Sequence, residues 1–184
     1  MKLFVKFDYH VVCKRVLEAQ LESLQIPYKL NGIGEIELSS DLKQEKKEAL
    51  IKGLAFYGIQ IIQDEKDVLV QRIKDIIYEM IFSNEENKTD KTSTVLANKL
   101  NYSYSYLSAI FSEITYSSIE NFVILKKIDY AKELMASNDS LTLTEIAHRL
   151  QYSSVAHLSS QFKKITGLTP SSFQKIMAKR RARV

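Results

Sequence analysis

Four polar side chains near the C-terminal end of the chain have the chemistry of nucleic-acid contacts. His157, Gln161, Lys163 and Lys164 lie in one short stretch whose apolar residues recur at helical spacing. Imidazole and amide groups hydrogen-bond to base edges, and ammonium groups pair with phosphates. A helix that carries these four side chains would suit a polyanion such as duplex DNA.

The chain repeats the unit that contains these residues. The segment Leu96–Ser103 (LANKLNYS) returns as Ile146–Ser153 (IAHRLQYS), and each copy continues through apolar residues to a phenylalanine, Phe111 or Phe162. Both copies then read Ile-Thr. Two copies of a helix-turn-helix unit allow one chain to contact two successive turns of a duplex.

The helical periodicity predicts which elements position these side chains. We expect first helices at Thr92–Leu100 and Leu143–Leu150, and second helices at Tyr104–Glu113 and Val155–Ile165. The residues expected to cap helices in this part of the chain include Ser103, Ser117 or Ser118, Thr142 and Ser153. The first helix braces the second, whose exposed face enters a major groove about 12 Å wide. The shared apolar face consists of Leu96, Leu100, Leu107, Ile110, Phe111, Ile146, Leu150, Leu158, Phe162 and Ile165. Between the pairs, Ile119–Ala136 reads as one helix, about 27 Å long at 1.5 Å per residue.

The outer faces of the second helices are small and polar. The residues predicted to contact DNA are Ser103, Tyr104, Ser105, Ser108, Ala109, Ser153, Ser154, Ala156, His157, Ser160, Gln161, Lys163 and Lys164. We therefore expect thymine-methyl, water-mediated and shape contacts, and a preference for A·T-rich sites.

The last hundred or so residues resemble the DNA-binding domain of the AraC/XylS family of bacterial transcription regulators. The matching residues are Glu145-Ile146-Ala147, Leu150, Tyr152-Ser153, Leu158-Ser159, Gln161-Phe162-Lys163-Lys164, Thr166-Gly167, Thr169-Pro170 and Phe173. The resemblance implies two helix-turn-helix units joined by a long helix, with double-stranded DNA and RNA polymerase as partners. One departure is that family members often place an arginine, which reads guanine by a bidentate contact, late in each second helix, where this chain has Ala109 and Ser160. Another departure is the turn position that usually holds glycine, which is Asn101 or Gln151 here. Glutamine predicts mild strain or a different turn.

Charge is distributed unevenly along the chain. The net charge is +4, yet residues 120–184 carry eleven Lys and Arg against five Asp and Glu, and residues 1–119 carry fifteen against seventeen. The C-terminal third is therefore the part expected to face a polyanion, with Lys179–Arg183 as a basic arm or a frayed end. Without a basic stripe along both second helices, the repeats would instead suit a protein-interaction adaptor.

The N-terminal part has a different pattern. Lys2–Phe7, Tyr28–Leu30, Ile33–Leu38 and Ile59–Ile62 read as strands, and helical stretches follow the first and third of them. Asn31-Gly32 is a hairpin signal, and Ser39, Ser40 or Asp41 would cap the second helix. The order predicts a ferredoxin-like βαββαβ domain at residues 1–66 in an α+β protein, followed by an all-α domain at residues 67–184.

His10 and Cys13 follow the first predicted strand. Together with the βαββαβ pattern, this placement is loosely similar to the heavy-metal-associated domains of copper chaperones. Two ligands do not complete a zinc site, and a lone cysteine is more often a small buried apolar residue. We therefore expect no cofactor, with a metal ion at His10 and Cys13 as the alternative. The domain would otherwise serve protein interaction, dimerisation or binding of an organic effector.

Other features limit the class of protein. No nucleophile-base pair, paired carboxylates or glycine-rich loop is present, so we expect a protein that is not an enzyme. One cysteine excludes an internal disulfide framework. The chain lacks a membrane-length apolar run and a signal-peptide pattern, which predicts a cytoplasmic protein. The predicted helix 67–82 carries a wide apolar stripe, Leu69, Ile73, Ile76, Ile77, Met80 and Ile81, part of which could pair two chains into a weak homodimer.

Overall fold

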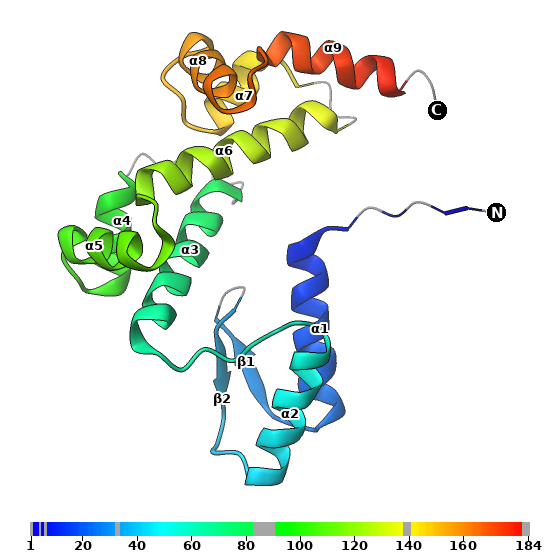
Figure 1. The fold of residues 1–184 in the computed structure, drawn as a ribbon, viewed down its shortest axis with the longest axis vertical. Coiled ribbons are helices and arrows are strands. Elements are labelled where there is room, and N and C mark those ends of the chain that lie inside the picture. Colours follow the sequence, from blue (N-terminus) through cyan, green and yellow to red (C-terminus); the bar gives the residue numbers. More distant parts are fainter. Residues whose placement is uncertain are drawn as a thin grey trace. The chain divides into compact units, whose positions relative to one another are not determined.

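The computed structural model describes residues 2–3, 5, 7–31, 34–82, 91–137 and 141–181, without the side chains of His10, Arg180 and Arg181. The described chain is mostly helical with one small sheet (Figure 1). It divides into two compact units, Met1–Asp75 and Ile76–Val184. The division falls inside helix α3 (Glu65–Phe82), and the predicted domain boundary after residue 66 stays a prediction.

The first unit packs two helices on a hairpin. Its elements are α1 (Tyr9–Ser23), β1 (Tyr28–Leu30), β2 (Ile36–Leu38), α2 (Gln44–Phe56) and the first part of α3. The strands are antiparallel, with Tyr28 opposite Leu38 and Leu30 opposite Ile36. The core between them consists of Leu17, Leu21, Ile26, Leu50 and Leu54. The hairpin predicted from Asn31-Gly32 is confirmed in its strand pairing, although Gly32 itself lies outside the described residues.

Local hydrogen bonds determine where these helices begin and end. The Asp8 side chain accepts the N–H of Val11 at 3.1 Å and so caps the start of α1. Helix α2 ends at Phe56, and Gly58 just beyond it has the left-handed φ of 74° that glycine tolerates. The cap predicted for α2 was wrong: the helix begins after Lys43, with no side-chain cap. Ser39 instead continues from the hairpin, where its N–H donates to the Pro27 carbonyl at 3.3 Å.

The predicted ferredoxin-like fold is wrong, because the described residues form only two strands. In the segment predicted as the first strand, residues 2, 3, 5 and 7 are described and lie in no strand, with Leu3 77% exposed. Residues 59–62 also run without a strand partner. β-Propensity measures how well side chains pack on a pleated surface, and these side chains find no such neighbours. Their apolar, β-branched composition was therefore a misleading signal.

The second unit is entirely helical within the described residues. Besides the end of α3 it contains α4 (Thr92–Leu100), α5 (Tyr104–Thr115), α6 (Ile119–Ala136), α7 (Leu143–Arg149), α8 (Val155–Thr166) and α9 (Pro170–Arg181). Helix α6 packs against α5 near one end and against α8 and α9 further along (Figure 1). The predicted bounds of α4 and α6 are confirmed, as is the long helix joining the two pairs.

Helix α3 buries most of its apolar stripe within the chain. Leu69, Ile73, Ile76, Ile77 and Ile81 are all buried, and Val68 is the apolar residue of this helix that remains 38% exposed. Little of the stripe is left to pair with a second chain, so self-association stays a prediction without a defined surface. Within the described residues, no helix combines the length and the apolar character needed to cross a membrane.

Candidate nucleic-acid interface

The second unit contains two helix-turn-helix pairs, α4 with α5 and α7 with α8, as the sequence repeat predicts. In each pair one left-handed residue reverses the chain after the first helix: Asn101 has φ 57° and Gln151 has φ 56°. Asparagine tolerates this conformation, whereas glutamine is strained there by about 1 to 2 kcal/mol. Both pairs use the same kind of turn, and the second turn carries the strain that its glutamine predicts.

A matching core braces each pair. The predicted bracing residues Leu96, Leu100, Leu107, Ile110, Phe111, Ile146, Leu150, Leu158 and Phe162 are buried. Ile165 is the exception at 36% exposed, because it lies near the end of α8. The ring of Phe111 meets Phe122 edge-on at 5.5 Å, and that of Phe162 meets Phe173 at 5.6 Å. The two pairs therefore share their core packing as well as their amino-acid sequence pattern.

The structure exposes most of the residues predicted to contact DNA. The exposed ones are Ser103, Ser105, Ala109, Ser153, Ser154, Ala156, His157, Ser160, Lys163 and Lys164, and the half-buried ones are Tyr104, Ser108 and Gln161. All of them lie on α5, on α8 or in the turn before each helix. They therefore form two separate polar surfaces, one for each pair, and their contact with DNA stays a prediction.

Two of the predicted serines begin the second helices. The Ser103 hydroxyl accepts the N–H of Tyr106 at 3.3 Å, and the Ser154 hydroxyl accepts that of His157 at 3.1 Å. The cap predicted at Ser153 was wrong by one residue, because the second turn is one residue longer than the first. The Ser153 hydroxyl instead lies 3.1 Å from Nδ1 of His157, which leaves Nε2 as the outer nitrogen of that ring.

Tyr104 is held by the long helix. Its hydroxyl donates to the carboxylate of Glu120 in the first turn of α6. Burial, followed by this hydrogen bond, raises the pKa of Tyr104, and the same bond lowers the pKa of Glu120. The contact joins α5 to α6. The hydroxyl of Tyr104 is therefore already bonded to a side chain of the same protein.

Tyr152 contacts two side chains of α8, although it is not among the residues predicted to contact DNA. Its hydroxyl donates to Oε1 of Gln161 at 3.1 Å, and its ring meets that of His157 edge-on at 5.2 Å. This bond fixes the orientation of the Gln161 amide, whose nitrogen can donate to a ligand. One tyrosine in the turn thus orients two of the polar side chains predicted to contact bases.

Lys127 of α6 contacts the aromatic ring of Tyr152. Its Nζ lies 5.4 Å from the centre of the Tyr152 ring, within the range of a cation-π interaction. Burial lowers the pKa of Lys127 and raises that of Tyr152 to about 12. The matching residue of the first pair, Tyr102, stacks on Tyr106 at 5.2 Å instead. The repeated Asn/Gln-Tyr-Ser turn was the signal that could have identified Tyr152.

The two second helices differ in charge at equivalent positions. Aligning Phe111 with Phe162 places Ser112 and Glu113 of α5 opposite Lys163 and Lys164 of α8. Both lysines are exposed. Residues 92–115 contain one Lys and one Glu, whereas residues 143–166 contain three Lys and Arg and one Glu. Of the basic arm 179–183, the side chain of Lys179 alone is described, and it is exposed.

The predicted metal ligands lie on α1. Cys13 is exposed, and the side chain of His10 lies outside the described residues. Across the described part of the chain, His, Cys, Asp and Glu side chains form no group of three or more that could hold a metal ion. The metal alternative at His10 and Cys13 therefore stays a prediction.

The sequence of the C-terminal part matches a known domain family. Residues 96–176 match the family model described as a helix-turn-helix domain. The chain is 29% identical over 108 residues to the uncharacterized HTH-type transcriptional regulator YtdP of Bacillus subtilis, covering 59% of this chain and 14% of that protein. It is 28% identical over 127 residues to the Msm operon regulatory protein of Streptococcus mutans, covering 69% of this chain and 43% of that protein.

The fold has counterparts among solved structures. The DNA-binding domain of AdpA, a global transcriptional factor solved in complex with a target DNA, is similar with a TM-score of 0.53 at 18% identity, over 62% of this chain and 97% of that one. At this identity the likeness concerns the fold. The chain spans less than half the length of either relative above. These similarities support the resemblance to AraC-type regulators, and none of them shows the heavy-metal-associated likeness of residues 1–66.

Proposed function

We propose that this chain is a bacterial transcription regulator that binds duplex DNA with α5 and α8 in successive major grooves. The observation that carries the proposal is the repeated pair itself: each second helix begins at a capping serine, is braced by a buried phenylalanine, and exposes its polar face. The helix-turn-helix match over residues 96–176 supports it. So does the fold shared with a domain solved on its target DNA.

The long helix gives the two pairs a suitable spacing. Helix α6 has 18 residues, which correspond to about 27 Å at 1.5 Å per residue. It packs on α5 near its start and on α8 and α9 further along. Successive major-groove faces on one side of B-form DNA are about 34 Å apart. A helix of this length holds two recognition helices at a separation of that order.

The second pair supplies most of the phosphate affinity in this proposal. Lys163 and Lys164 are exposed in the last turn of α8, where ammonium groups can meet the DNA backbone. Base contacts come from the amide nitrogen of Gln161 and from Nε2 of His157. The amide nitrogen can donate to acceptors such as thymine O4, whereas the bidentate contact that selects adenine would require Oε1 to accept a second hydrogen bond besides the one from Tyr152. This geometry fits the predicted reliance on A·T-rich, shape-dependent sites.

Selection of bound duplexes from a random pool tests the proposal. The full chain should enrich a site with two parts, their centres about 10 to 10.5 base pairs apart. A variant with Gln161→Ala and His157→Ala should lose sequence preference in one part and keep it in the other. A pool with no enrichment would overturn the proposal and favour the adaptor interpretation. Contact with RNA polymerase and self-association are finer points that this experiment leaves as predictions.

A further inference from the structure

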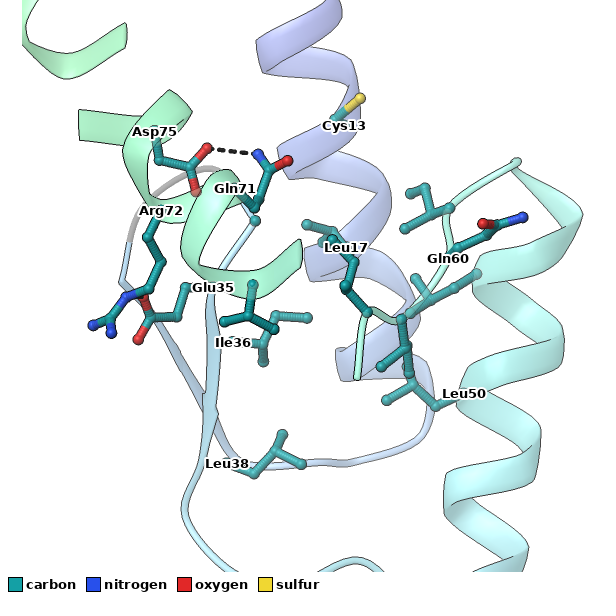
Figure 2. Close-up of a pocket in the computed structure, with 16 residues that line it drawn as sticks. Cys13, Leu17, Glu35, Ile36, Leu38, Leu50, Gln60, Gln71, Arg72 and Asp75 are labelled. Atoms are coloured by element: carbon teal, nitrogen blue, oxygen red, sulfur yellow. Dashed lines mark hydrogen bonds and ion pairs between the residues drawn. The ribbon is translucent and has the colours of Figure 1, made fainter. Parts of the chain in front are cut away.

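The first unit encloses a cavity that the proposed DNA-binding function does not use. Its volume is about 490 Å³, within the range of about 300 to 1,000 Å³ typical of small-molecule sites. The walls come from α1, β2, α2, the segment 59–62 and the start of α3 (Figure 2). Leu17, Ile36, Leu50 and Leu54 are among the apolar side chains that line it. An apolar body of drug-like size would therefore fit here.

One end of the cavity is polar and negatively charged. Its charged lining residues are two carboxylates, Glu35 and Asp75, and one guanidinium, Arg72. Arg72 Nε lies 3.1 Å from Glu35 Oε2, and both of these side chains are partly exposed. Asp75 is 7% exposed, and its Oδ1 accepts a hydrogen bond of 2.8 Å from Gln71 Nε2 (Figure 2). The end formed by α3 thus places a buried carboxylate next to apolar walls.

The position of Asp75 indicates what the cavity selects. It is the one charged side chain that is buried among the described residues, and its carboxylate, which accepts a hydrogen bond from Gln71, lines the cavity. The other carboxylate oxygen, Oδ2, lies near Gly34 of the hairpin. A Cβ atom built on Gly34 would be 3.8 Å from Oδ2, an ordinary van der Waals distance. With two carboxylates and one guanidinium in the lining, the complementary ligand group is cationic.

We infer that this cavity binds a small organic amine, with an apolar body against the walls and a protonated amino group directed to Asp75. The apolar body supplies affinity through burial, and the charged end supplies specificity. Nothing in this inference depends on DNA. The site and the helix-turn-helix pairs can therefore be tested apart.

Indole compounds give a direct test, because the chain contains no tryptophan. Tryptamine, 3-ethylindole and indole-3-propionate share one ring system and carry a cationic, a neutral and an anionic side chain. Each is titrated with the full chain in the absence of DNA, with indole emission as the readout. We expect a blue shift on binding, and tryptamine affinity at least about tenfold higher than that of indole-3-propionate, the gain of one charge-assisted hydrogen bond.

Two substitutions locate the binding. Asp75→Asn should weaken tryptamine about tenfold and leave 3-ethylindole almost unchanged. Val68→Phe, which fills the cavity from α3, should weaken all three ligands. Asp67→Asn is the matched control, because Asp67 is an exposed carboxylate of the same helix outside the lining. The helical signal in circular dichroism is the check that each variant is folded.

Three results would overturn the inference. They are an absence of any emission change with the three ligands, equal affinity for tryptamine and indole-3-propionate, and full binding by folded Val68→Phe. The first two use the unaltered chain, so they decide the question even if Asp75→Asn fails to fold. Loss of DNA binding in a separate assay would leave all three results unaffected.

Discussion

The two helix-turn-helix pairs share a frame and differ in surface. Both reverse the chain through a left-handed residue, and both pack a buried phenylalanine against a second aromatic ring. The first pair exposes Ser112 and Glu113 where the second exposes Lys163 and Lys164. The repeat thus preserves the packing while the surface charge changes. The two pairs are therefore expected to contribute unequally to DNA affinity.

The largest expected effect comes from removing the lysine pair. Replacing Lys163 and Lys164 with Ala should weaken binding to all sequences, by roughly ten- to a hundredfold at low salt, and flatten the salt slope by about one to two units. The equivalent double variant in the first pair, Ser112→Ala with Glu113→Ala, is the matched control. It should bind as well as the unaltered chain or slightly better, because it removes a negative charge. Equal losses of DNA affinity in the two double variants would contradict the proposal that the two pairs contribute unequally to binding. Fluorescence anisotropy over a range of salt concentrations measures both quantities.

The next effect concerns sequence preference. Tyr152→Phe removes the hydroxyl that holds Oε1 of Gln161, so the amide can rotate and make a bidentate contact with adenine. We expect a changed preference at one base pair, worth roughly 1 to 3 kcal/mol, with an unaltered salt slope. The control is Tyr102→Phe in the first pair, where the ring stacks on Tyr106 and no such bond is described. Selection from a random pool should show no change for the control. A salt slope altered by Tyr152→Phe would indicate a structural effect instead.

The first helices of the two pairs also differ in how they begin. Helix α7 has a capping box in which Thr142 and Glu145 bond to each other's backbone N–H, whereas Lys91 before α4 makes no side-chain cap. Thr142→Ala should therefore cost about 1 kcal/mol of unfolding free energy, and Lys91→Ala close to nothing. Urea unfolding measures both values. A loss at Lys91 as large as that at Thr142 would show that capping does not distinguish the pairs.

The capping box gives this contrast a pH dependence. The bonds from Thr142 lower the pKa of Glu145 below its ordinary value. A lowered pKa in the folded state means that the stabilisation is present above the unfolded pKa and is lost as the pH falls through the folded pKa. The difference between the unaltered chain and Thr142→Ala should therefore shrink in acid. If the difference in unfolding free energy stays constant as the pH falls through the folded-state pKa of Glu145, the proposed role of the carboxylate is contradicted.

The smallest expected effect is in the turns. Gln151→Gly should stabilise the protein by about 0.5 to 1 kcal/mol, because relief of left-handed strain exceeds the entropy that glycine adds to the unfolded chain. Asn101→Gly should change little, since asparagine already tolerates the conformation. Thermal unfolding of the two variants provides the comparison. Destabilisation by Gln151→Gly would mean that the contacts of the glutamine outweigh the backbone strain.

Much of the helical unit could be predicted because its signals are local. Periodicity and capping residues gave the correct bounds for Thr92–Leu100 and Ile119–Ala136, and they placed caps at Ser103 and Thr142. The cap at Ser154 was missed by one residue. The two copies of the sequence match at Ser103 and Ser153, but the second turn has one more residue between its left-handed residue and the cap.

Contacts between distant residues could not be predicted in the same way. The bond from Tyr152 to Gln161 crosses a turn whose geometry decides which side chains meet, and Lys127 reaches Tyr152 from a different helix. The strands predicted at both ends of the first unit failed for a related reason. A strand requires a neighbour, and residue type does not supply one. The cavity in that unit is lined by residues 59–62, which were predicted as a strand and are not in one.

Hydroxyl-radical footprinting of the full chain on a selected duplex tests the central claim most directly. If α5 and α8 enter successive major grooves, protection should appear as two patches on one side of the duplex, about 10 to 10.5 base pairs apart. The patch assigned to α8 should be the stronger, and Lys163→Ala with Lys164→Ala should weaken that patch first. A single patch, or two patches on opposite sides of the duplex, would contradict the account.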